Sequence, residues 1–149
     1  ARIGLVVTPA GGLLKPLLPA SAVGLAGWPG RGDAWWPWIA LDDVVYAFHR
    51  LALDASVSGP VNLSAPEPAQ TKTFMQTLAA VQNRPALVRV PEGLVRALGG
   101  DLASELALKS VRVVPERLLA MGHRFALPDL SAALGHVLGR LDTHMHPAS

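Results

Sequence analysis

The stretch Ile3-Gly4-Leu5-Val6-Val7-Thr8-Pro9 decides the fold that the sequence predicts. Residues 3–7 form an apolar run rich in β-branched side chains, which is typical of a strand buried on both faces inside a parallel sheet. The chain opens directly on this run without a methionine, so we expect it to be cut from a longer polypeptide. A strand that lacks its neighbour exposes an unpaired edge, and the isolated chain is therefore expected to aggregate or oligomerise.

Beyond this strand, extended and helical patterns alternate along the chain. Thr8-Pro9-Ala10-Gly11-Gly12 predicts a turn whose glycines allow the backbone to approach a ligand closely. Further strands are expected at residues 36–40, 60–63, 87–90 and 111–114. Amphipathic spacing and turn residues predict helices at 13–18, 43–53, 72–82, 91–99, 102–108, 115–121 and 130–138. The fold class is therefore α/β, although the sheet is too small for a complete doubly wound fold.

Polar residues mark the ends of several of these helices. Asp42, Thr71 and Asp129 each precede a predicted helix and are expected to cap its first turn. Asn83 suits the left-handed position after the helix that Thr71 begins. Asp42 and Asp43 would also suit an acid/base pair, but carboxylates are favoured at helix N-termini, so the capping interpretation is preferred.

Four tryptophans, Trp28, Trp35, Trp36 and Trp38, lie close together in and after a glycine-rich segment. Indole rings give a flexible loop a rigid apolar wall. Such a loop in front of a helix N-terminus is one way in which proteins close over a small molecule. The alternative is that the indoles fill core space, because tryptophan is usually well buried.

Composition excludes several classes of protein. Half of the residues are hydrophobic and 16% are charged, so much apolar surface must be buried within the chain or against a partner. The formal net charge is only +2 and the basic residues are scattered, which argues against a nucleic-acid partner. No apolar run approaches the roughly 18 residues of a membrane span, and no signal peptide is visible. Cysteine is absent, which excludes disulfides and permits a reducing compartment, so we expect a cytoplasmic protein.

The residue patterns that carry catalysis are missing from the chain. It has neither the glycine fingerprint of a dinucleotide-binding fold nor a P-loop. The single tyrosine, Tyr46, is followed four residues later by Arg50 instead of lysine, so a Tyr–Lys proton-transfer pair is absent. His144 and His146 alternate without a third ligand nearby, and no metal site is expected. His136 has no carboxylate at a telling spacing. We therefore expect no catalytic residue in this chain.

Several motifs follow one another in a specific order over residues 1–140. The first are Arg2-Ile3-Gly4-Leu5-Val6-Val7-Thr8-Pro9, Gly11-Gly12, the glycines at 27, 30 and 32, and Trp35-Trp36-Pro37-Trp38-Ile39 with Asp42-Asp43. Four further groups follow downstream: Ser58-Gly59-Pro60-Val61-Asn62-Leu63-Ser64-Ala65-Pro66, Arg84-Pro85-Ala86 with Val90-Pro91, Val111-Arg112-Val113-Val114-Pro115-Glu116-Arg117-Leu118-Leu119, and Gly122-His123-Arg124-Phe125. Together they resemble the second half of an extended or atypical short-chain dehydrogenase/reductase. Within that group, the motifs resemble those of the NAD-dependent epimerase family proteins. These proteins are similar to nucleoside-diphosphate-sugar epimerases and carry a C-terminal domain of unknown function.

The resemblance implies the fold and its division into parts. In that family the glycine fingerprint and the Tyr-x-x-x-Lys pair precede the strand that begins here, so this chain would be the C-terminal half. It would hold the last part of a Rossmann-type fold and a small, mostly helical substrate-binding domain. Residues 1–55 would end the dinucleotide-binding sheet and carry the Gly/Trp substrate loop and the following helix. Residues 56–140 would form the C-terminal α/β substrate-binding domain, and residues 141–149 a flexible tail.

The resemblance also implies a cofactor, NAD(P), and a division of the binding residues. Backbone at Thr8 and Pro9 would lie against the nicotinamide end of the cofactor, whose larger part the N-terminal half would bind. Asp43 would have a structural role. The substrate side would be lined by Gly11, Gly12, Lys15, Trp35, Trp36 and Trp38, with Asn62 at its rim.

The chain departs from the family pattern in the Trp loop. The family usually has a glutamine where Ala34 stands, a histidine where Ala40 stands, and a basic or polar residue where Asp33 stands. These changes remove polar groups that would hold an anionic sugar nucleotide, although Arg31 offers a replacement. The resemblance therefore implies a class of reaction and no particular substrate.

Two functions from different classes remain open. In the first, the chain is the substrate-binding half of an NAD(P)-dependent epimerase or oxidoreductase, inactive alone, with a small molecule such as a nucleotide sugar as partner. In the second, it is a free-standing, non-catalytic module that binds a ligand or a protein, and its apolar surface serves an interface such as that of a homo-oligomer. Neither reading includes a membrane or a nucleic acid as partner.

Overall fold

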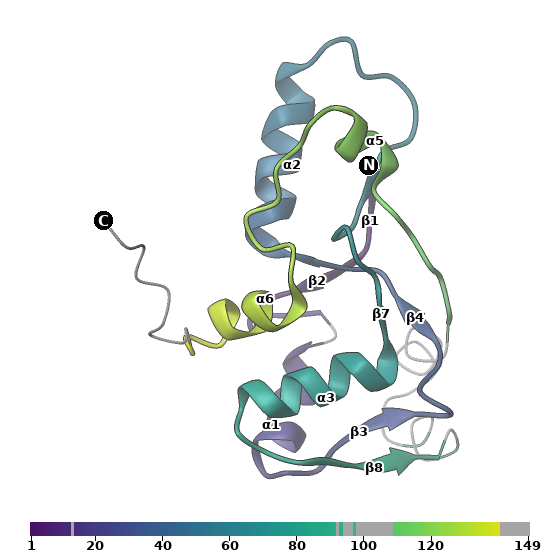
Figure 1. Cartoon of the computed structure of the whole chain (residues 1–149), viewed down its shortest axis with the longest axis vertical. Coiled ribbons are helices and arrows are strands. Elements are labelled where there is room, and N and C mark those ends of the chain that lie inside the picture. The colour runs from purple at the N-terminus through teal and green to yellow at the C-terminus, as the bar shows by residue number, and fades with distance from the viewer. Residues whose placement is uncertain (13, 92, 94–96, 98–108, 141–149) are drawn as a thin grey trace.

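The computed structural model describes residues 1–12, 14–91, 93, 97 and 109–140 of the chain (Figure 1). The fold is α/β, as predicted, with short strands joined in pairs and helices packed around them. In Figure 1 the helices α2 and α5 lie at one end of the molecule and α1 and α3 at the other, with α6 between them. Three predicted segments lie wholly or largely outside the described part: the helices at 91–99 and 102–108 and the tail at 141–149.

The first strand divides in two at Gly4. β1 (Arg2–Ile3) pairs in parallel with β6 (Asn62–Leu63), and β2 (Leu5–Val7) pairs in parallel with β5 (Trp38–Ala40). A Cβ atom at Gly4 would lie 2.3 Å from the carbonyl oxygen of Pro37, so no side chain fits where the strand changes partner.

The prediction that residues 3–7 are buried on both faces is wrong. Ile3 is 48% exposed, and Val7 is the only buried residue of the two strands. Each half of the strand belongs to a two-stranded pairing within the described residues, so no wide sheet with helices on both faces covers it.

The Gly/Trp segment consists of two short strands, β3 and β4, joined by a turn at residues 30–34. β3 (Ala26–Pro29) includes Trp28 and pairs in parallel with β8 (Ala86–Val90). β4 (Trp35–Trp36) pairs antiparallel with β7 (Ala69–Gln70). The strands expected at 60–63 and 87–90 are confirmed with shifted ends as β6 and β8. The one expected at 36–40 is instead two strands, β4 and β5, which are separated at Pro37 and pair with different partners. The one expected at 111–114 is not a strand, although the Val111 amide donates to the Trp35 carbonyl at 3.0 Å.

Five of the expected helices lie in the described part. They are α1 (Leu14–Ala22), α2 (Leu41–Leu53), α3 (Thr71–Val81), α5 (Glu116–Ala120) and α6 (Leu130–Val137). α1 was expected to end near Pro19 but continues through it. A proline inside a helix removes one hydrogen bond. Here the packing of Leu14, Leu17 and Leu18 against the core offsets that loss.

The predicted helix caps have mixed outcomes. Asp129 caps α6, because its carboxylate accepts a hydrogen bond from the Ala132 amide at 2.9 Å. Asp42 does not cap α2, because it lies inside the first turn and Ala40 holds the N-cap position. Thr71 likewise lies inside the first turn of α3, where Gln70 holds the N-cap position. Neither N-cap residue makes a side-chain hydrogen bond to its helix. Asn83 adopts the predicted left-handed conformation, with φ of 54°.

Two clusters of buried side chains form the core. The larger one joins α3 and α6 to the strands, and within it the rings of Trp36 and Phe74 meet edge to face with centroids 5.3 Å apart. The smaller one comprises Ile39, Val44, Ala47, Val61, Leu63 and Leu118. Both clusters draw on residues before and after position 55. None of the helices in the described part is long and apolar enough to cross a membrane.

Candidate functional site

Thr8 and Pro9 stand where β2 ends, at the carboxyl end of the parallel pair that it forms with β5. In open α/β folds, ligands bind outside the carboxyl ends of parallel strands. Here a cavity of about 200 Å³ occupies that position. We call it the strand-end cavity; it is lined by Val7, Thr8, Pro9, Ala40, Leu41, Asp42, Leu127, His136 and Val137.

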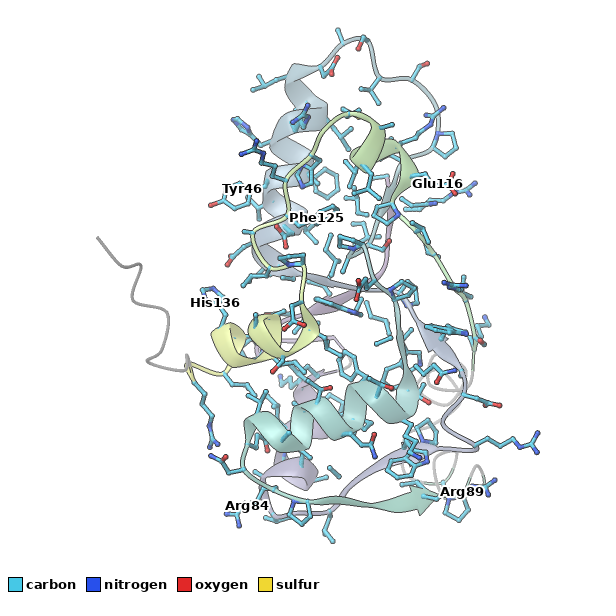
Figure 2. All side chains as sticks on the ribbon, in the orientation of Figure 1. Tyr46, Arg84, Arg89, Glu116, Phe125 and His136 are labelled. Atoms are coloured by element: carbon cyan, nitrogen blue, oxygen red, sulfur yellow. The ribbon has the colours of Figure 1, made fainter. Side chains whose placement is uncertain are left out.

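A histidine and a carboxylate meet at the strand-end cavity. His136 Nε2, in the last turn of α6, lies 2.9 Å from Asp42 Oδ2, in the first turn of α2, and the two side chains are 44% and 51% exposed. Figure 2 shows His136 on the side of α6 that faces the start of α2. This pair could not be predicted from the sequence, because 94 positions separate the two residues.

Asp43, next to Asp42, is turned inward and has the structural role that was expected of it. It is 1% exposed, and its carboxylate accepts hydrogen bonds from the backbone amides of Ala126 and Leu127 at 2.6 and 3.0 Å. Hydrogen bonds to an ionised acceptor are stronger than neutral ones. Asp43 therefore fixes the segment that carries Leu127 to the wall of the strand-end cavity.

The four tryptophans separate into core and surface positions. Trp36 and Trp38 are 2% and 1% exposed, so the core-filling alternative holds for these two. Trp28 and Trp35 are half-buried, and each carries a cation over its ring: Lys72 Nζ lies 5.3 Å from the Trp28 ring centroid and Arg112 Cζ lies 5.0 Å from that of Trp35.

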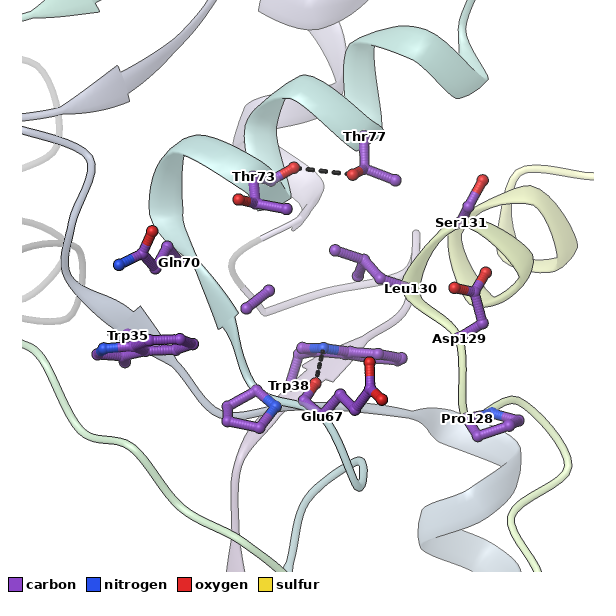
Figure 3. A pocket seen from close by; sticks show the side chains of 12 residues that line it. Trp35, Trp38, Glu67, Gln70, Thr73, Thr77, Pro128, Asp129, Leu130 and Ser131 are labelled. Carbon is purple, nitrogen blue, oxygen red and sulfur yellow. Dashed lines mark hydrogen bonds between the residues drawn. The ribbon is translucent and has the colours of Figure 1, made fainter.

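A second cavity, of about 350 Å³, contains Trp35 in its wall (Figure 3). We call it the Trp35 cavity. Its other walls come from Trp38, the segment before α3, α3 itself, and the segment that leads into α6. They are formed by Glu67, Pro68, Ala69, Gln70, Thr73, Thr77, Pro128, Asp129, Leu130 and Ser131. The Trp38 indole donates its N–H to the Glu67 carbonyl at 3.0 Å, which fixes the ring at the base of the cavity.

The structure does not gather the expected site residues at one place. Thr8 and Pro9 line the strand-end cavity, whereas Trp35 and Trp38 line the Trp35 cavity. The remaining expected residues line neither of these two cavities and are Gly11, Gly12, Lys15, Trp36 and Asn62. Gly12 has a φ of 61° in the turn after β2, Lys15 is exposed on α1, and Asn62 pairs in register with Arg2.

A third, open hollow of about 520 Å³ lies along α2. His123 lines it together with Tyr46, His49, Arg50, Leu53 and Asp54. His123 is 8% exposed, its ring meets Phe125 edge to face at 4.8 Å, and its Nε2 has no hydrogen-bond partner. Burial lowers the pKa of His123; the Asp43 carboxylate acts in the opposite direction and the Arg50 guanidinium lowers it further. In the described part, no group of three or more potential ligands could hold a metal ion.

Comparison of the sequence with those of known proteins identifies relatives of this chain. Residues 90–137 match the model of a domain of unknown function, DUF1731. The chain is 36% identical over 140 residues to the epimerase family protein Mb2239 of Mycobacterium bovis. The matched region covers 94% of this chain and 46% of that protein. The chain therefore spans about half the length of the curated relatives that it matches.

Solved structures agree. The crystal structure of human epimerase family protein SDR39U1 with NADPH superposes with a TM-score of 0.86 at 31% identity, covering 94% of this chain and 48% of that one. The nucleoside-diphosphate sugar epimerase from Corynebacterium glutamicum gives a TM-score of 0.69 at 33% identity, covering 93% of this chain and 25% of that one. By sequence and by fold, the chain is the counterpart of the C-terminal half of the epimerase family proteins, which share the Rossmann-type short-chain dehydrogenase/reductase fold.

Proposed function

We propose that the chain is the substrate-binding half of an NAD(P)-dependent sugar-nucleotide epimerase or oxidoreductase. One observation carries the proposal: 94% of the chain superposes on one half of a relative that was solved with NADPH. The glycine fingerprint and the Tyr-x-x-x-Lys pair are absent from this sequence, so the proposal assigns them to a preceding segment. By itself the chain would not catalyse epimerisation or carbonyl reduction.

The strand-end cavity fits one end of such a cofactor. It lies at the carboxyl ends of β2 and β5, and Val7, Ala40 and Val137 give it apolar walls suited to a flat ring. At about 200 Å³ it is too small for a whole dinucleotide, which agrees with a preceding segment that binds the remainder. When bound, the nicotinamide supplies the hydride chemistry.

Residues of this chain would orient the reactants and exclude water. Backbone at Thr8 and Pro9 would lie against the nicotinamide end, and Leu127, held by Asp43, would close the wall beside it. Gly11, Gly12, Lys15, Trp35, Trp38 and Asn62 would face the substrate, with Trp36 supporting them from the core. Residues 1–55 would complete the dinucleotide-binding sheet and residues 56–140 would form the substrate-binding part. The protein would act in the cytoplasm.

The proposal is tested by comparing two lengths of the protein. The chain alone and the chain with the reading frame that precedes Ala1 are titrated with NADPH and NADH by calorimetry and assayed for carbonyl reduction and sugar epimerisation. We expect the longer protein to bind the dinucleotide and the chain alone to bind it weakly and to be inactive. Tight NADPH binding or turnover by residues 1–149 alone would contradict the proposal.

A second candidate function rests on the surface of α2. Val45, Tyr46, Phe48 and Leu53 are between 44% and 75% exposed along this helix, which suits a module that binds a protein or a ligand without catalysis. The genomic reading frame separates the two functions. An upstream in-frame glycine fingerprint with a Tyr-x-x-x-Lys pair supports the enzyme, and the absence of both supports the free-standing module.

A further inference from the structure

The outer surface of α2 carries a row of apolar side chains that the described residues leave uncovered. Leu41, Val45, Phe48 and Ala52 follow one another at helical spacing, so they lie along one face of the helix. Leu41, Val45 and Phe48 are 44%, 58% and 44% exposed, and Ala52 is exposed as well. We call this face the α2 stripe.

The α2 stripe is not the face by which the helix packs on the rest of the chain. α2 packs against β2 and β5, and its buried side chains are those of Asp43, Val44 and Ala47. Leu51 packs against the smaller core cluster from the same side. A surface helix usually has a single apolar face with polar residues opposite it. The second apolar face of α2 is therefore the pattern of a helix that is covered on two sides.

The side chains of the α2 stripe define the chemistry of what would cover it. None of its four residues is charged or polar. The charged groups beside it have contacts within the chain, since Asp42 pairs with His136 and Arg50 donates to the Met121 carbonyl. Apolar residues at this spacing are the surface against which a second helix packs. The occupant that fits is an apolar helix face without charges.

The position of the α2 stripe indicates where such a helix would come from. Leu41, at one end of the stripe, also lines the strand-end cavity. A helix along the stripe would therefore reach the cavity where the proposed function needs a preceding segment to hold the rest of the dinucleotide. Figure 1 places the N-terminus of the chain at the same end of the molecule as α2 and α5.

The relatives are long enough to supply this helix. The chain covers 46% of the Mycobacterium bovis protein and 48% of the human structure, so each has about as many residues again outside the matched region. A second copy of the chain is the competing occupant, and dilution separates the two.

We infer that the α2 stripe is the surface on which the segment before Ala1 packs, through the apolar face of one of its helices. The inference rests on the proposed function, which assigns such a segment to the protein, and it adds the place of contact. The segment would then complete the strand-end cavity beside Leu41. Without it, the stripe is open to water and available to other copies of the chain.

The test compares the chain alone with the longer protein that the reading frame encodes. The chain has no cysteine, so Val45→Cys places a thiol on the stripe that maleimide can label, with the labelled peptide identified by mass spectrometry. Labelling is expected to be at least about tenfold slower in the longer protein than in the dilute chain alone. Val23→Cys is the matched control, because Val23 is 69% exposed and lies away from α2, and it should label equally in both.

A charge on the stripe gives a second, independent measurement. Phe48→Lys should lower the urea midpoint of the longer protein by about 1 M, because the lysine would be buried without a partner. The same change should leave the midpoint of the dilute chain alone nearly unaltered, since Phe48 is exposed there. Val23→Lys should alter neither. If Phe48→Lys prevents the longer protein from folding, the labelling of Val45→Cys still decides.

The outcomes separate this inference from the proposed function. Equal labelling of Val45→Cys in both lengths overturns the inference, as does a Phe48→Lys midpoint unchanged in the longer protein. Protection of the longer protein that disappears on dilution identifies a second copy as the occupant and also overturns it, as does a reading frame without a preceding segment. A protected stripe in a longer protein that binds no NADPH by calorimetry contradicts the proposed function alone.

Discussion

At the scale of single residues, Asp42 and Asp43 are adjacent carboxylates with different surroundings. Asp43 is 1% exposed and binds two backbone amides, whereas the Asp42 side chain is 51% exposed and pairs with His136. Asp43→Ala would leave the amides of Ala126 and Leu127 without their acceptor. We expect it to lower the free energy of unfolding by about 2–4 kcal/mol. Asp42→Ala is the matched control, with a loss below about 1 kcal/mol. Urea unfolding measures both, and equal losses would contradict the assignment.

His123 makes stability depend on pH. Burial holds the pKa of its imidazole below the ordinary 6.5. As the pH falls through 6.5, the unfolded chain therefore takes up a proton that the folded chain resists. The contribution of His123 is fully present above pH 6.5 and is lost as the pH falls toward the lowered pKa of the folded state. Urea unfolding from about pH 8 to about pH 5.5 should show this decline. His123→Gln should flatten it, and His49→Gln, an exposed change, should not.

At the scale of the element, Gly4 is the point where one strand changes pairing partner. A methyl group there would overlap the Pro37 carbonyl, whose oxygen also accepts the Leu5 amide at 2.6 Å. Gly4→Ala should therefore separate β2 from β5 and cost about 3 kcal/mol or more. Gly11→Ala is the matched control, because a Cβ atom there meets nothing within 4 Å, and its effect should stay within about 1 kcal/mol. Near-equal midpoints in urea for the two variants would show that the close approach at Gly4 is not needed.

The sequence predicted some elements well because the information is local. α2, α3, α5 and α6 begin and end within two residues of their expected ends, since amphipathic spacing and the residues after each helix mark them. Strand lengths and burial failed because they depend on partners far along the chain. β1, for example, pairs with residues near position 62. The cavities were not predicted for the same reason. His136, for example, lies beside Asp42 because α6 packs against β2.

At the scale of the whole molecule, the family resemblance predicted more than the residue patterns did. It identified the fold and the relatives, and the solved human structure agrees over 94% of the chain. It did not foresee that the expected cofactor residues, Thr8 and Pro9, line one cavity while Trp35 and Trp38 line another. A resemblance transfers an order of motifs, whereas the shape of a cavity depends on how side chains such as Ala40 and His136 pack around it.

The exposed apolar surface also belongs to this scale, and it predicts self-association of the isolated chain. Tyr46 and Leu53 on α2 are 58% and 75% exposed, and Ile3 on β1 is 48% exposed. Burying such surface between two copies gains about 25 cal/mol per Å². Size-exclusion chromatography with light scattering should therefore show a mass that rises with concentration. Tyr46→Lys combined with Leu53→Lys should reduce the association, because each change places a charge in the contact. Val23→Lys, at a residue that is 69% exposed away from α2, should not. A monomer with one cooperative thermal transition at every concentration would mean that this surface is tolerated in water and that the N-terminal strand needs no partner.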